Sequence, residues 1–196
     1  LDNAATTAVA PEVLEAMIPV LRDHYGNPSS SHSIGRKSRV IIEQSRRFIA
    51  GHIGCHPRTI YFTSGGTEAD NLALRSAVRD LGCQRIITSA AEHSAVIKTA
   101  ESLQRTSGIQ LELVRHLEDG VIDYAHLEEL LANGPKTLVS LMHANNEVAV
   151  VQDLERIGQL CRANQALFHT DTVQTMCHYR FDLRSLPVDF ITCSAH

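Results

Sequence analysis

Short apolar runs and longer helical patterns alternate along most of this chain, and this alternation constrains the fold more than any other feature. Runs rich in β-branched and aromatic residues predict strands, and the amphipathic segments between them predict helices. We expect strands at 60–63, 85–88, 111–114, 137–142, 166–169 and 189–193. The alternation predicts an α/β fold with a mostly parallel sheet and flanking helices on both faces.

The helical patterns span about 11–23, 33–53, 67–81, 94–106, 123–132 and 153–164. Pro11 fits the first turn of the first helix, because its missing N–H would have no partner there in any case. The first helix precedes the alternating region. We therefore expect residues 1–25 to form an N-terminal arm and residues 26–196 to belong to one large domain.

Composition excludes several classes of protein. The 196 residues carry a formal net charge of −4 and no cluster of Lys or Arg, so we expect no nucleic-acid partner. No apolar run reaches the roughly 20 residues that cross a bilayer, so we expect no membrane partner. The five cysteines are scattered and odd in number, which favours reduced thiols and a cytoplasmic protein: Cys55, Cys83, Cys161, Cys177 and Cys193.

Polar and ionisable residues follow the predicted strands. Open parallel sheets bind ligands beyond the carboxyl ends of their strands, where loops and helix N-termini converge. The sequence therefore predicts one cleft lined from several strand ends: by Ser64–Glu68, Glu92 and His93, Asn145–Glu147, Asp171 and Gln174, and Ser194 and His196.

Gly65, Gly66 and Thr67 stand where a strand is expected to turn into a helix. Their N–H groups could hold a phosphate at the positive end of the helix dipole, and an ordinary N-cap is the alternative interpretation. The spacing matches neither a dinucleotide-binding glycine motif nor a nucleoside-triphosphate loop.

Asp171 closes the apolar run that begins at Ala166, where a carboxylate is costly unless it pairs with a cation. A protonated pyridine nitrogen is one such cation, and a helix cap or a structural ion pair is the alternative. Gln174 could face the same ligand. His93 could stack on a ring and carry protons, although among 11 histidines a lone one is usually structural or solvated.

Two small His/Cys groups raise the question of a metal site. His52, Cys55 and His56 lie close together in sequence, and Cys193 and His196 form a CxxH pair. Neither group has a fourth ligand or a zinc-finger spacing, so we expect no metal.

Five segments, taken together and in order, resemble the signature segments of cysteine desulfurases of the NifS/IscS type, which are pyridoxal-phosphate enzymes of the class V aminotransferase family. They are Leu-Asp-Asn-Ala-Ala-Thr-Thr at 1–7, Gly-Asn-Pro-Ser-Ser at 26–30, Thr-Ser-Gly-Gly-Thr-Glu at 63–68, His-Ala-Asn-Asn-Glu-Val at 143–148 and His-Thr-Asp at 169–171.

The resemblance implies the large domain of the aspartate aminotransferase fold (fold type I), here incomplete and without the small C-terminal domain. It implies removal of sulfur from L-cysteine, which leaves L-alanine and an enzyme persulfide for iron–sulfur cluster assembly or other sulfur transfer. It also implies a homodimer that works with sulfur-acceptor or scaffold proteins.

The resemblance also assigns roles to individual residues. Gly66, Thr67, Ser194 and His196 would bind the cofactor phosphate, and Asp171 would pair with the ring nitrogen. His93 would stack on the ring and act as the catalytic proton carrier. Asn146 and Gln174 would contact the ring near its hydroxyl group.

Some family features fall outside the printed residues or differ from them. The family's cofactor-bearing lysine should follow His196, and its sulfur-accepting cysteine should lie further on; none of the five cysteines here matches it. Ala149 stands where the family commonly has glycine. Thr172 and His178 stand where small and basic residues are commoner.

Three other functions remain open from the sequence. A selenocysteine lyase or another class V enzyme would share the phosphate and ring contacts. A catalytically inactive scaffold would keep the fold and bind sulfur-transfer partners. A plain α/β domain would carry the same polar residues as helix caps and solvated loops.

Overall fold

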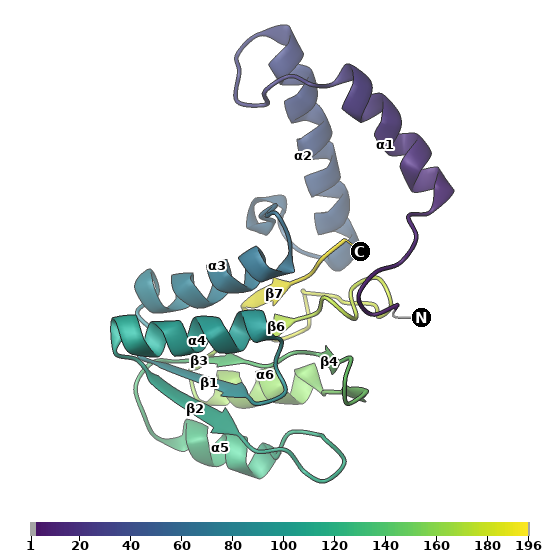
Figure 1. Cartoon of the computed structure of the whole chain (residues 1–196). Coiled ribbons are helices and arrows are strands. Elements are labelled where there is room, and N and C mark those ends of the chain that lie inside the picture. The colour runs from purple at the N-terminus through teal and green to yellow at the C-terminus, as the bar shows by residue number, and fades with distance from the viewer. Residues whose placement is uncertain (1–2, 196) are drawn as a thin grey trace. The chain divides into compact units, whose positions relative to one another are not determined.

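The computed structural model describes residues 3–195 and divides them into two compact units, one running up to Tyr61 and the other spanning Phe62–Ala195 (Figure 1). The first unit contains helix α1 (Pro11–Asp23), helix α2 (Ser33–Ile53) and a short 3-10 helix, η1 (Pro57–Thr59). The bounds of α1 and α2 confirm the two N-terminal helices predicted from periodicity.

Local chemistry sets the ends of α2. The side chain of His32 accepts a hydrogen bond from the Gly35 N–H at the N-terminus. At the C-terminus, Gly54 adopts a left-handed conformation with φ 74°, which glycine accepts without steric cost.

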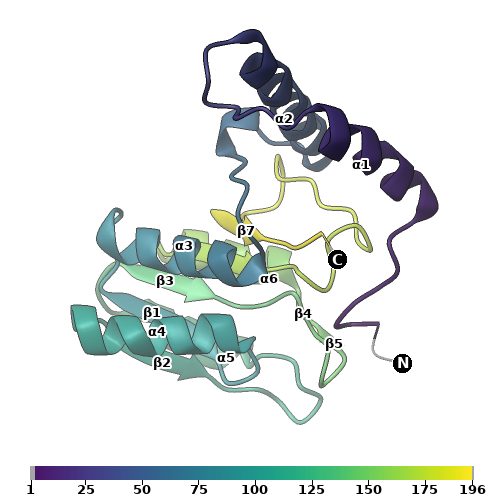
Figure 2. The same ribbon diagram turned by 45° about the horizontal axis from the view of Figure 1, so that its top comes forward.

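The second unit is built on a five-stranded sheet whose strands all run parallel, in the order β2-β1-β3-β6-β7 (Figure 2). The α/β fold with a mostly parallel sheet is therefore confirmed. The strands are β1 (Arg85–Ser89), β2 (Gln110–Val114), β3 (Thr137–Ser140), β6 (Leu167–Asp171) and β7 (Phe190–Thr192).

Helices cover both faces of this sheet, with α3 and α4 on one side and α5 and α6 on the other (Figure 1). The side chains of each strand alternate between the two cores: Ile86 packs with the α3–α4 core, and Ile87 packs with the α5–α6 core. This period of two explains why the central strands read as continuous apolar runs. The helices are α3 (Gly66–Arg79), α4 (Ser94–Ser107), α5 (Tyr124–Ala132) and α6 (Leu154–Ala163).

The prediction of a strand at 60–63 is wrong, since these residues are irregular and pair with no strand of the sheet. Composition favoured a strand because the run is β-branched and aromatic. However, Tyr61 is 74% exposed and Phe62 is 49% exposed, so these two side chains are not buried against the sheet.

A small antiparallel hairpin escaped the sequence pattern. Strands β4 (Ala144–Asn145) and β5 (Val150–Val151) pair across a turn directly after β3. Strands of two residues are too short to show alternation. The prediction of 137–142 was longer than β3, although ladder-type bonds continue, with the His143 N–H donating to the Asp171 carbonyl at 2.9 Å.

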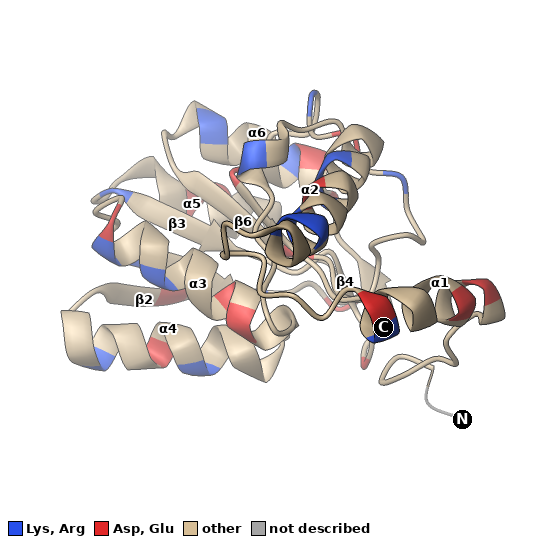
Figure 3. Cartoon of the chain, turned by 90° about the horizontal axis from the view of Figure 1, so that it is seen from above, with Lys and Arg blue, Asp and Glu red and all other residues tan. Residues whose placement is uncertain are grey.

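Charges are mixed on the surface, as Figure 3 shows for α4, where Lys98, Glu101 and Arg105 alternate in sign. Within the part of the chain that the structure describes, none of the helices combines the length and apolar character needed to span a bilayer.

Candidate cofactor site

Glu92, His93, Asn145, Asn146, Asp171, Gln174 and Ser194 lie in or directly after the carboxyl ends of β1, β3, β6 and β7, at the edge of the sheet where α3 and α4 begin (Figure 2). Ser64 and Gly65 follow no strand and lead directly into α3. Asp171 ends β6 and pairs in register with Thr192, which ends β7. Parallel register thus brings the ends of these two strands, and the loops that follow them, to one edge of the sheet.

The first turn of α3 faces that edge. A methyl group built on Gly66 would lie 2.8 Å from Val173 Cγ2 and 4.0 Å from Ser194 Cβ, so the backbone here packs closely against the loop after β6 and the end of β7. Gly65, the N-cap, provides no side-chain cap. The first N–H groups of α3 therefore remain available for an anion at the positive end of the helix dipole.

Asp171 is 4% exposed, and its Oδ1 accepts a hydrogen bond from the Val173 N–H at 2.8 Å. Burial raises the pKa of this carboxyl, while the Val173 N–H and the nearby His93 side chain act in the opposite direction. A cationic partner would stabilise the charged form that burial disfavours.

His93 is the N-cap of α4, where its Nδ1 accepts a hydrogen bond from the Ala95 N–H at 3.2 Å. An acceptor at Nδ1 leaves Nε2 as the nitrogen that carries a proton in the neutral ring. The side chain itself is exposed, so it can meet a ligand.

Glu92, one of the predicted strand-end residues, connects the ends of two strands. Its Oε1 accepts hydrogen bonds from Ser89 Oγ at 3.1 Å and from the Met142 N–H at 2.9 Å, so it joins the ends of β1 and β3. Its Oε2 has no partner among the described residues. Burial raises the pKa of Glu92 to about 8. The only sequence signal was its position next to His93.

The remaining predicted residues lie in different surroundings. Asn146 is exposed in the β4–β5 turn, while its neighbour Asn145 donates to the Ala91 carbonyl and accepts from the N–H of Glu147 at 2.7 Å. Gln174 is half-buried in the turn after Asp171, and Ser194 is half-buried beside Gly66. His196 lies outside the described residues.

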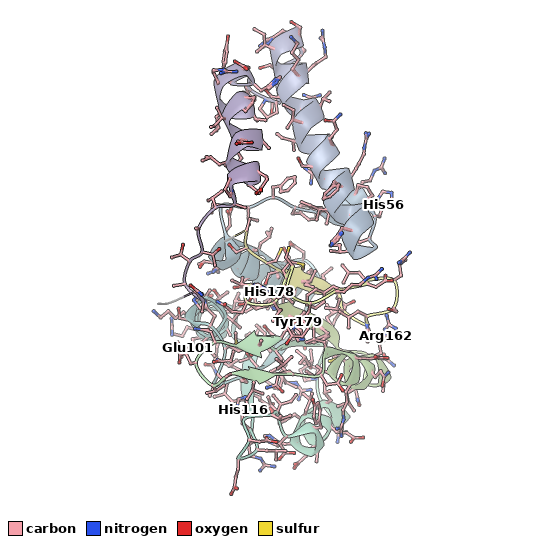
Figure 4. The ribbon with its side chains drawn as sticks, turned by 90° about the vertical axis from the view of Figure 1, so that its right-hand side faces the viewer. His56, Glu101, His116, Arg162, His178 and Tyr179 are labelled. Carbon is pink, nitrogen blue, oxygen red and sulfur yellow. The ribbon has the colours of Figure 1, made fainter. Side chains whose placement is uncertain are left out.

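The three positions that depart from the family pattern also have structural correlates. Ala149 has φ 54°, a left-handed conformation in which glycine is common. Thr172 donates its hydroxyl to the Thr192 carbonyl at 2.7 Å and so extends the contact between β6 and β7. His178 is exposed on the segment between β6 and β7, next to Tyr179 (Figure 4).

No cluster of three or more His, Cys, Asp or Glu side chains suited to a metal ion occurs in residues 3–195. The site instead combines an uncapped helix N-terminus, the buried carboxyl of Asp171 and the exposed side chain of His93. These features fit pyridoxal phosphate, which has an anionic phosphate, a basic ring nitrogen and a flat aromatic ring.

Comparison with known proteins shows the family of this chain. The family model for aminotransferase class-V matches residues 1–196. The cysteine desulfurase IscS of Methanosarcina thermophila is 39% identical over 199 residues, which cover 100% of this chain and 48% of that protein. The chain thus spans about half the length of the curated relatives it matches.

Two solved structures are also similar to this chain. A NifS-like protein superposes with a TM-score of 0.94 at 37% identity, covering 100% of this chain and 54% of that one. SspA, solved in complex with cysteine, superposes with a TM-score of 0.87 at 34% identity, covering 98% and 56%. Because the family model matches residues 1–196, this chain belongs to the class V aminotransferase family.

Proposed function

We propose that this chain is the cofactor-binding part of a pyridoxal-phosphate-dependent cysteine desulfurase. The observation that carries the proposal is the buried carboxyl of Asp171 beside the uncapped first turn of α3, since this pair suits a ring cation and a phosphate on one ligand. The similarity to IscS and NifS-like proteins supports the choice of reaction within the family.

Each residue has a role that its chemistry and position support. The N–H groups at Gly66 and Thr67, with Ser194 and His196, would bind the phosphate. Asp171 would hold the ring nitrogen in its protonated form. Asn146 and Gln174 would contact the ring near its hydroxyl group, an assignment that rests on the family motif alone.

Bound pyridoxal phosphate supplies an electron sink for the electron pair released when the substrate loses its Cα proton. Asp171 would maintain that capacity, because a carboxylate in a desolvated site would favour the protonated form of the ring nitrogen. His93 would lie over the ring and move a proton through Nε2, since its Nδ1 is engaged by the Ala95 N–H.

The proposed substrate is L-cysteine, consistent with the cysteine complex of the similar protein SspA. The products would be L-alanine and a persulfide on a cysteine outside residues 1–196. The outer sulfur of that persulfide would then pass to sulfur-acceptor or scaffold proteins, as in iron–sulfur cluster assembly. A homodimer and a cytoplasmic location complete the proposal.

The test is alanine formation from L-cysteine by the complete protein loaded with pyridoxal phosphate. We expect one alanine for each sulfur released, with no added keto acid, and a His93→Ala variant should lower the rate. A requirement for a keto acid would assign an aminotransferase. A preference for selenocysteine would assign a lyase, and cofactor binding without turnover would assign a scaffold.

A further inference from the structure

A buried network of polar side chains lies on the α3 side of the sheet, close to Asp171. Thr192 Oγ1 donates a hydrogen bond to Asp70 Oδ1 at 2.6 Å and lies 3.4 Å from His169 Nε2. His169 Nδ1 lies 2.8 Å from Ser140 Oγ. The network therefore joins α3, β7, β6 and β3 in one connected set.

Its members are inaccessible to solvent. Asp70 is 1% exposed, and His169 and Ser140 are fully buried. A buried carboxyl requires hydrogen-bond partners or a cation, because desolvation strongly disfavours its charged form. Asp70 has the hydroxyl of Thr192 as its hydrogen-bond donor, at 2.6 Å.

His169 does not act as a cation for Asp70, although its Nε2 lies 3.6 Å from Asp70 Oδ1. Burial lowers the pKa of His169 to about 3, so the imidazole is neutral at physiological pH. The pair is therefore a contact between a neutral ring and a carboxyl group.

Asp70 also interacts electrostatically with Asp171 of the cofactor site. Side chains two apart on a strand share a face, so His169 and Asp171 both lie on the face of β6 that carries Leu167 and the α3–α4 core. Burial, followed by the negative charge of Asp171, raises the pKa of Asp70 to about 7, against the opposing hydrogen bond from Thr192. Glu92, from the loop after β1, also interacts with both carboxyls.

We propose that Asp70 is a positioning residue of the cofactor site: through Thr192 and His169 it holds β7 and β6 against the first turns of α3. Thr192 lies two residues before Ser194, and Asp70 lies three residues after Thr67, on the same face of α3. A fixed Asp70 thus sets the spacing between two phosphate contacts. The cofactor part of this inference rests on the proposed function.

Two substitutions separate shape from charge. Asp70→Asn keeps an acceptor for the Thr192 hydroxyl and is neutral at all pH values. Asp70→Ala removes the acceptor of the Thr192 hydroxyl and breaks the link from α3 to β6 and β7. Asp189→Asn is the control, because Asp189 is exposed and its Oδ2 accepts from the Phe168 N–H at 2.8 Å near the opposite end of β6; it should bind cofactor like wild type.

The first readout is urea unfolding of the complete, cofactor-free protein between pH 5.5 and 8. A carboxyl whose pKa is raised on folding binds more protons in the native state, so its contribution to stability falls as pH rises through its folded pKa. Wild type should release close to one more proton on unfolding than Asp70→Asn at pH 5.5, and this difference should fall toward zero as the pH approaches 8.

The second readout is the affinity for pyridoxal phosphate, measured by absorbance titration. We expect Asp70→Ala to weaken binding by at least tenfold and Asp70→Asn to stay within a factor of about two of wild type. If Asp70→Ala does not fold, Thr192→Val, which removes the hydroxyl that donates to Asp70, replaces it and should also weaken binding. Wild-type affinity in the folded variant would overturn the inference, whereas a wild type that binds no cofactor would overturn the proposed function and leave the unfolding result standing.

Discussion

Asp70, Glu92 and Asp171 are buried carboxyls that influence one another at the residue scale. Burial is the largest cause of the raised pKa in each, and the charge of Asp171 raises the pKa of the other two further. Only Asp171 has a histidine, His93, that lowers its pKa electrostatically. The negative charge is therefore best placed on Asp171, where a ring cation would bind.

The role of Asp171 can be tested with one variant that removes the carboxyl group and one that removes only its charge. Asp171→Ala should lower alanine formation by at least about 100-fold, because it removes a preorganised charge from a desolvated site. Asp171→Asn still accepts from the Val173 N–H and should lose nearly as much activity. Asp182→Asn, an exposed carboxylate paired with Arg184, is the control. Near-wild-type rates in Asp171→Ala would contradict the assignment.

Glu92 predicts a pH dependence of stability. Its pKa is raised to about 8, so the folded state holds this proton from about pH 4.5, where the unfolded chain releases it, up to pH 8. Stability from this group is therefore full below pH 4.5 and falls as pH rises to 8. Glu92→Gln mimics the protonated acid and should gain on the order of 4 kcal/mol over wild type at pH 8, and only about 1 kcal/mol at pH 5. Urea unfolding at both pH values measures this, and an equal difference at both would contradict it.

Regular helices were predictable from the sequence at the element scale, because periodicity and end signals are local. Pro11 begins α1 as predicted, and the predicted starts at 123 and 153 coincide with the N-cap residues of α5 and α6. The error at 60–63 has the opposite cause: a strand exists only if a neighbour pairs with it, and composition does not specify a neighbour. The Asp70–His169 network could likewise not be predicted from the sequence, since it joins side chains far apart in sequence and depends on the order of strands in the sheet.

The β4–β5 turn offers a prediction about backbone conformation. Ala149 has φ 54° and donates its N–H to the Asn145 carbonyl at 3.0 Å. A left-handed residue with a Cβ is strained by about 1 kcal/mol or more, so Ala149→Gly should stabilise the protein by roughly 0.5 kcal/mol after the entropy of glycine is deducted. Ala16→Gly, in the exposed middle of α1, should instead destabilise by about 1 kcal/mol. Urea unfolding free energies of both variants test the difference in sign.

Apolar surface is the main unexplained property at the scale of the whole molecule. None of the residues of α1, Pro11–Asp23, is buried, although the helix is amphipathic. Its apolar side chains are about half exposed, and Leu21 is 72% exposed. Apolar faces of this kind mark surfaces that another chain or another segment covers. They are the physical support for the proposed homodimer.

The homodimer predicts a concentration-independent mass in solution. Sedimentation equilibrium of the complete protein should give twice the mass of one chain from about 1 µM upward, because obligate interfaces rich in apolar surface hold at such concentrations. A Leu14→Glu, Ile18→Glu double variant places charge on the exposed apolar face of α1, and Glu12→Gln, Glu15→Gln is its matched surface control. Dissociation of the first variant alone would show that a second copy covers α1. A dimer that withstands both variants would place the interface elsewhere, and a monomer at every concentration would mean that the face is covered within a single chain.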